Sequence, residues 1–142
     1  MSDDADPTGV DLSPTRQCHC LAARREAREL TRFYEEKLRP HGLRATQFSI
    51  LATLAQKGPT LITELAELLG LERTSLTRSA DVMEREGWIE DAPSEDGRER
   101  PLRLTDEGRE KVESAFPAWK EAQMAVDRAR ESERPRTGEE AR

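Results

Sequence analysis

Several features that define other classes of protein are scarce or missing in this chain of 142 residues. It has no apolar run of 18 residues, so no membrane-spanning helix and no membrane partner are predicted. Its acidic N-terminus differs from the basic, apolar start of a signal peptide. Two cysteines are too few for a disulfide-stapled scaffold. We therefore expect a soluble, cytoplasmic protein.

The motifs of common catalytic and cofactor sites are missing as well. The sequence has no Gly-rich phosphate loop, no thioredoxin-like βαβ pattern near its cysteines and no convergent pair of carboxylates. Its two histidines are His19 and His41, the second in a turn after Pro40. We expect neither an enzyme nor a bound cofactor.

Apolar residues are also few, at 35% of the chain, while charged residues reach 37%. Such a balance predicts one domain with loosely held ends. Residues 1–15 carry four aspartates and no base, and residues 132–142 are almost entirely polar. We expect a disordered acidic arm over 1–15, a folded domain over 16–131 and a disordered tail over 132–142.

Hydrophobic periodicity divides the domain into helices and two short strands. Spacings of three and four residues predict helices over 15–39, 45–57, 60–69 and 72–86, with Thr60 as the N-cap of the third. After Gly87 the period changes to two, which predicts strands over 88–91 and 101–104. Thr105 then caps a last helix that runs to about Arg130, with a kink expected at Pro117.

This order is the plan of a winged helix-turn-helix: a mainly α fold with a small β-hairpin wing. On the helix over 72–86, Leu76, Ala80 and Met83 fall on one face and leave short polar side chains and arginines on the other. That second face would lie in a DNA major groove. The predicted contacts there are Arg73, Thr74, Ser75, Thr77 and Arg78. The wing would contribute Arg98, Arg100 and Arg103, the first two suited to a narrow minor groove.

The stretches "ELAELLGLERTSLTR", "MEREGWIE", "DGR" and "LTDEGRE" occur in an order that resembles the MarR family of bacterial transcriptional regulators, over roughly residues 16–125. The resemblance implies a homodimer formed by N- and C-terminal dimerisation helices. It also implies binding to a pseudo-palindromic double-stranded DNA operator, and release by a small phenolic or other aromatic effector or by an oxidant. We expect a regulator of this kind, acting as a repressor.

The sequence departs from that family in its charge and in its ends. The C-terminal "ESERPRTGEEAR" is too polar to form the usual last dimerisation helix, which predicts a weaker dimer. Residues 59–104 sum to −5 and the whole chain to −6, whereas residues 16–58 sum to +5. DNA affinity would then depend on a few placed arginines. Glu72 stands where a short capping side chain is common.

Other interpretations of the same residues remain open. The wing and helix arginines are also typical of solvated surfaces, with Arg73 and Arg78 paired to Glu72 and Asp81. An acidic winged helix is also compatible with a protein-interaction module that does not bind DNA. Four aromatic residues are better explained as core or dimer-interface residues than as ligand sensors: Phe48, Trp88, Phe116 and Trp119.

Cys18 and Cys20 flank His19 at the start of the first helix. The helix dipole and the nearby Arg24 would favour a reactive thiolate. In a helix, however, positions i and i+2 point apart, so joint action needs an extended or frayed segment. Three ligands also fall short of a structural zinc site, and no metal is predicted. Ordinary thiols are the simplest interpretation, and a redox switch at Cys18 and Cys20 is the alternative.

Overall fold

The computed structural model describes residues 9–94, 97 and 100–134. The chain divides into two compact units, residues 1–32 and 33–142. One helix, α1 (His19–Leu38), begins in the first unit and ends in the second. No helix within the described ranges combines the length and the hydropathy needed to cross a membrane.

The first unit contains a short 3-10 helix followed by the beginning of α1. The 3-10 helix covers Ser13–Gln17, and Cys18 separates it from α1 in an extended conformation. The predicted continuous helix over 15–39 is therefore wrong at its start, because Pro14 opens a tight turn that closes with the Cys18 N–H on the Thr15 carbonyl. The helical turn also occupies the last residues of the expected arm over 1–15, whose first eight residues lie outside the described part.

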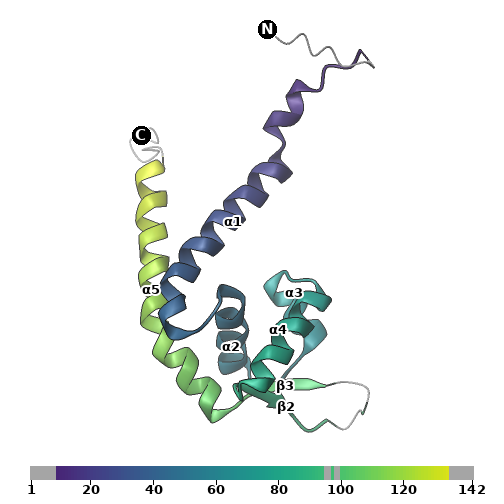
Figure 1. Ribbon diagram of the computed structural model, residues 1–142, viewed down its shortest axis with the longest axis vertical. Helices are drawn as coiled ribbons and strands as arrows, with labels where there is room; N and C mark the ends of the chain where they lie inside the picture. The colour runs from purple at the N-terminus through teal and green to yellow at the C-terminus, as the bar shows by residue number, and fades with distance from the viewer. Residues whose placement is uncertain (1–8, 95–96, 98–99, 135–142) are drawn as a thin grey trace, which may run out of the picture. The chain divides into compact units, whose positions relative to one another are not determined.

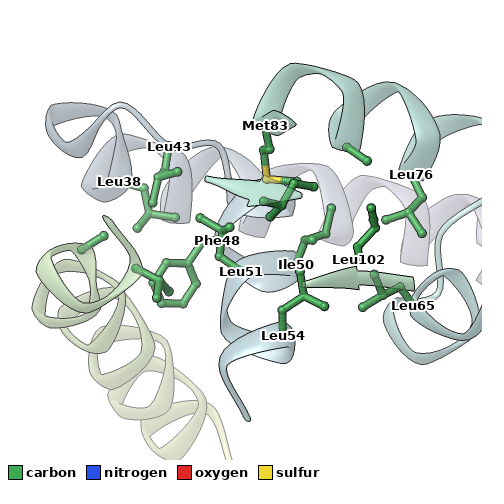
Figure 2. Packing of buried hydrophobic residues seen from close by; sticks show 14 of the residues in the cluster. Leu38, Leu43, Phe48, Ile50, Leu51, Leu54, Leu65, Leu76, Met83 and Leu102 are labelled. Carbon is green, nitrogen blue, oxygen red and sulfur yellow. The ribbon is translucent and has the colours of Figure 1, made fainter. Parts of the chain in front are cut away.

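The second unit is built around α2 (Ala45–Lys57). Ile50, Leu51 and Leu54 on this helix are essentially inaccessible to solvent, and they belong to one buried cluster with Leu65, Leu76 and Leu102 (Figure 2). The Glu35 carboxylate on α1 accepts the N–H of Ala45, which satisfies one of the unpaired donors at the start of α2. The broad apolar face of this segment thus makes it the core helix, as its sequence predicts.

Two further helices form the helix-turn-helix (Figure 1). The first, α3 (Ile62–Leu69), ends at Gly70, whose φ of +64° is readily adopted by glycine. The second, α4 (Arg73–Arg85), follows after a connection of three residues. Thr60 is not the N-cap of α3, which corrects the prediction: its hydroxyl donates to the Gly58 carbonyl and its backbone belongs to a strand.

That strand completes a three-stranded antiparallel sheet where a two-stranded hairpin was predicted. β1 (Thr60–Leu61), β2 (Ile89–Asp91) and β3 (Pro101–Leu104) lie in the order β1-β3-β2. The hairpin register places Ile89 opposite Leu104 and Glu90 opposite Arg103. Leu102 lies on the central strand, β3, and its side chain is buried in the core. The buried face of the sheet thereby anchors the wing to the helix-turn-helix.

The last helix, α5 (Asp106–Glu133), begins at the predicted cap. The Thr105 hydroxyl accepts from the Gly108 N–H and donates to the Gly87 carbonyl, which joins α5 to the entry of β2. The helix continues through Pro117, and Figure 1 shows its axis changing direction part-way along. The helix ends at Glu133, inside the expected tail over 132–142, whose residues 135–142 lie outside the described part.

Candidate nucleic-acid interface

The first half of α4 has a polar face that is exposed to solvent and an apolar face that is buried. Leu76, Ala80 and Met83 are buried, as the periodicity predicts. The five predicted contact residues are all exposed: Arg73, Thr74, Ser75, Thr77 and Arg78. Within the part of the chain that the structure describes, Arg73 and Arg78 do not pair with Glu72 or Asp81. Their guanidinium groups are therefore available to an external partner.

The N-terminus of α4 also lacks a side-chain cap. Glu72 occupies the N-cap position with an extended backbone, but its side chain makes no capping hydrogen bond. The backbone N–H groups of the first turn thus keep their positive partial charge toward solvent. An anionic oxygen such as a DNA phosphate is the kind of group that such a helix start binds.

The three predicted wing arginines have different surroundings. Arg98 lies outside the described residues. Arg103, on β3, donates from Nε to the Glu90 carboxylate at 2.7 Å, and both side chains are close to half exposed. Arg100 makes a two-pronged contact with Asp91, with Nε–Oδ2 at 3.2 Å and Nη2–Oδ1 at 3.1 Å. The sequence-based prediction placed all three against DNA and overlooked these acidic neighbours.

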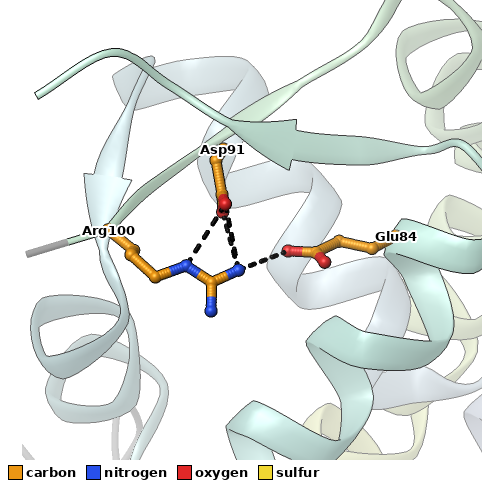
Figure 3. A network of polar contacts seen from close by, with 3 residues as sticks. All are labelled: Glu84, Asp91 and Arg100. Carbon is orange, nitrogen blue, oxygen red and sulfur yellow. Dashed lines mark hydrogen bonds and ion pairs between the residues drawn. The ribbon is translucent and has the colours of Figure 1, made fainter.

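The Arg100 guanidinium also faces Glu84 on α4, with Nη2–Oε1 at 3.6 Å (Figure 3). Burial and the negative charge of Asp91 raise the pKa of the Glu84 carboxyl, while Arg100 opposes that shift. The hydrogen bond and charge of Asp91 raise the pKa of Arg100. Arg100 thus holds together two carboxylates that would otherwise repel each other.

A groove of about 580 Å³ runs between α2 and α5, within the second unit. Its walls are aromatic and apolar, with Phe48 and Ala52 on α2 facing Phe116 and Trp119 on α5. The Trp119 ring stacks on Phe48 and on Phe116, each at a centroid distance of 5.8 Å. The core interpretation holds for Phe48, which is buried, and for Trp119 and Trp88, which pack against the core; Phe116 is 48% exposed.

Cys18 and Cys20 are both free and exposed. Cys18 lies in the extended link before α1, and Cys20 in the first turn of that helix, where the Arg24 guanidinium approaches its sulfur at 3.8 Å. The two thiols therefore do not share one regular helix. No group of three or more potential metal-ligating side chains gathers in the described ranges.

Comparison with known proteins agrees with this arrangement. The model of the MarR family matches residues 43–99, from the entry of α2 through the helix-turn-helix into the wing. The structure of the Mycobacterium tuberculosis transcriptional regulator MosR in complex with DNA is 40% identical, covers 77% of this chain and 80% of that one, and superposes with a TM-score of 0.70. The chain belongs to the MarR family of transcriptional regulators.

Two curated transcriptional regulators each match part of the chain. An HTH-type transcriptional regulator of Bacillus subtilis, YwoH, is 34% identical over 87 residues, which are 61% of this chain and 64% of that protein. The transcriptional repressor MprA of Escherichia coli is 37% identical over 83 residues, 56% of this chain and 47% of MprA. The chain thus spans about half to two thirds of these curated relatives. A DNA-binding regulator is supported over a protein-interaction module.

Proposed function

We propose that this protein is a transcriptional repressor that binds a pseudo-palindromic operator as a homodimer. In this proposal α4 of each protomer enters a major groove through Arg73, Thr74, Ser75, Thr77 and Arg78. The wings reach the flanking minor grooves, where Arg98 and Arg103 contact the DNA. Two recognition helices related by a twofold axis are then about one helical turn apart.

The observation that carries the proposal is the two-sided character of α4. Its inner face is fixed by buried Leu76 and Met83, while its outer face combines short polar side chains with the exposed Arg73 and Arg78. Such a surface recognises base edges and phosphates together. The DNA-bound structure of MosR and the repressor MprA support the same assignment for this chain.

Hydroxyl-radical footprinting tests the proposal on DNA from upstream of the protein's own gene. We expect two protected half-sites, with centres about 10 base pairs apart or a small multiple of that spacing. Titration at high DNA concentration should saturate at two protomers for each site. Protection of a single half-site by one protomer, or no protection against a scrambled competitor, contradicts the proposal.

We further propose that the groove between α2 and α5 receives the small aromatic effector. Its stacked rings and its apolar walls suit a planar aromatic molecule. Arg109 and Glu113, 4.0 Å apart as an exposed ion pair, also line the groove and could orient a polar substituent.

Tryptophan fluorescence tests this assignment, since the chain has two tryptophans. In a Trp88→Phe variant, Trp119 is the single reporter, and we expect salicylate, used as a phenolic probe, to change its emission and to weaken operator binding. Ala52→Phe, which fills the groove, should abolish both effects while DNA binding persists. An equal response in Ala52→Phe contradicts the assignment.

A redox switch at Cys18 and Cys20 is a second mode of control that we propose. In this step two thiols lose two electrons and two protons to a peroxide, forming an intramolecular disulfide and water. The extended link at Cys18 and the exposure of both sulfurs support it. Peroxide should lower operator affinity in the parent protein and leave a Cys18→Ser, Cys20→Ser variant unchanged; equal responses of the two proteins contradict the switch.

A further inference from the structure

Arg100 lies where three parts of the candidate interface come together. Arg100 directly precedes β3 in the chain. Its guanidinium pairs with Asp91 at the end of β2 and with Glu84 near the end of α4. Figure 3 shows the guanidinium directed toward both carboxylates. The contact therefore links the wing to the helix proposed to read the major groove.

The geometry separates this contact from ordinary surface ion pairs. Most exposed pairs add little stability, but a planar, two-pronged arginine–carboxylate contact and a network of several charges are the recognised exceptions. The Arg100 side chain is 60% exposed, so its contribution to global stability is modest. What the contact determines is orientation, because two hydrogen bonds to one carboxylate fix the plane of the guanidinium.

The strands of the wing are short, with three residues in β2 and four in β3, and they are fixed to the core through β1 and the buried Leu102. Among the described residues, the Arg100 contacts add a polar link from the root of the wing to α4. A wing that varied in direction would lose that freedom on binding DNA, at a cost in affinity. A contact made before binding removes part of that cost.

We propose that Arg100 is a positioning residue that clasps the root of the wing to the end of α4, and that it does not itself contact DNA. The clasp, defined as Arg100 with Asp91 and Glu84, makes the recognition helix and the wing one rigid reading unit. The inference rests on the proposed function and replaces the DNA contact first predicted for Arg100.

Arg103 provides the matched comparison within the same wing. It is also a half-exposed arginine paired with an acid on β2, but its partner Glu90 is its direct cross-strand neighbour in the hairpin. The Arg103–Glu90 pair therefore joins β2 to β3 and does not reach α4. Variants of this pair should not alter how the wing is set against the recognition helix.

The sign of the effect of Asp91→Asn distinguishes a clasp from a DNA contact. If Arg100 bound a phosphate, removing its competitor Asp91 would tighten operator binding. For a clasp, we expect Asp91→Asn and Arg100→Gln each to weaken operator binding by about two- to tenfold, and the double variant to be no weaker than the single variants. Glu90→Gln should not weaken binding.

Salt dependence and non-specific binding supply the second readout. A lost phosphate contact lowers the slope of log affinity against log salt by about 0.9, whereas a lost clasp leaves it unchanged. We expect Arg100→Gln to keep the slope of the parent protein and its affinity for non-operator DNA. Tighter or unchanged operator binding in Asp91→Asn, or a slope reduced by one ion pair in Arg100→Gln, overturns the proposal.

Hydrogen exchange tests the clasp without DNA and separates its failure from failure of the proposed function. The Ala92 N–H donates to the Pro101 carbonyl at 2.8 Å, beside the clasp, and the Thr105 N–H donates to the Trp88 carbonyl at the other end of the hairpin. In Arg100→Gln we expect faster exchange of the Ala92 N–H and unchanged exchange of the Thr105 N–H. Unchanged exchange at Ala92 contradicts the clasp, whereas a parent protein that binds no operator contradicts the proposed function.

Discussion

At the scale of single residues, the proposed DNA contacts lie on the outer face of α4. Arg78→Ala should weaken operator binding by about 1–3 kcal/mol if its guanidinium meets a base edge. Arg128→Ala on α5 removes the same charge from an exposed helical position and should change affinity much less. Competition between operator and non-operator DNA measures both. Equal losses in the two variants would mean that charge, and not position on α4, sets the affinity.

The sequence predicts which side of α4 is buried because the helical repeat alone fixes that pattern. It does not predict that Arg100 meets Asp91 and Glu84, since this depends on the strand register and on how the wing packs against α4. Arg103 is an intermediate case: once the hairpin register is known, Glu90 lies directly opposite it. Side-chain partners across elements require the assembled fold.

At the scale of elements, the junction between the wing and α5 depends on Thr105. Its side chain makes two hydrogen bonds, to the Gly108 N–H at 3.0 Å and to the Gly87 carbonyl at 2.6 Å. Thr105→Ala should lower the free energy of unfolding by about 1 kcal/mol or somewhat more. Thr105→Ser keeps the hydroxyl and should retain most of that stability in chemical denaturation. Similar losses in both variants would assign the effect to the methyl group.

Gly108 is required at the same junction for a different reason. A Cβ at this position would lie 2.0 Å from the Trp88 carbonyl oxygen, a backbone atom that cannot easily move. Gly108→Ala should therefore destabilise the fold by about 1–3 kcal/mol or more, despite alanine's higher helix propensity. Gly97→Ala, at a position with open space around it, is the control for thermal unfolding. A Gly108→Ala protein as stable as the parent would contradict the close approach.

Long elements are well predicted from the sequence, and short ones are not. The core helix, α4 and the Thr105 cap follow from periodicity and capping chemistry. β1 has two residues, too few to show a repeat, and so the sequence predicts a helix cap at Thr60 where the structure has a strand. The predicted first helix is interrupted at Cys18, whereas Pro117 does not end α5.

At the scale of the whole molecule, the proposed dimer depends on α5. Met124 on this helix is a large apolar side chain that is 49% exposed and so is accessible to a second protomer. Met124→Asp should weaken dimerisation by about tenfold or more, because a charge would be buried at the interface. Met124→Leu should not. Sedimentation of both variants at several concentrations measures the change, and identical behaviour would place the interface elsewhere.

The charge distribution of the molecule also affects how strongly it attracts DNA. Residues 59–104, which hold the recognition helix and the wing, carry a net charge of −5. Attraction by a general positive field is therefore small, and affinity must come from individual arginines and from the start of α4. Non-specific DNA binding should accordingly be weak compared with operator binding.

Specific DNA binding through a limited number of phosphate contacts can be measured by titrating operator DNA over a series of salt concentrations. We expect log affinity to fall linearly with log salt, with a slope of about −0.9 for each phosphate neutralised. Operator DNA should remain preferred over scrambled DNA at every salt concentration. Affinity that does not change with salt, or equal affinity for the two DNAs, would contradict this expectation.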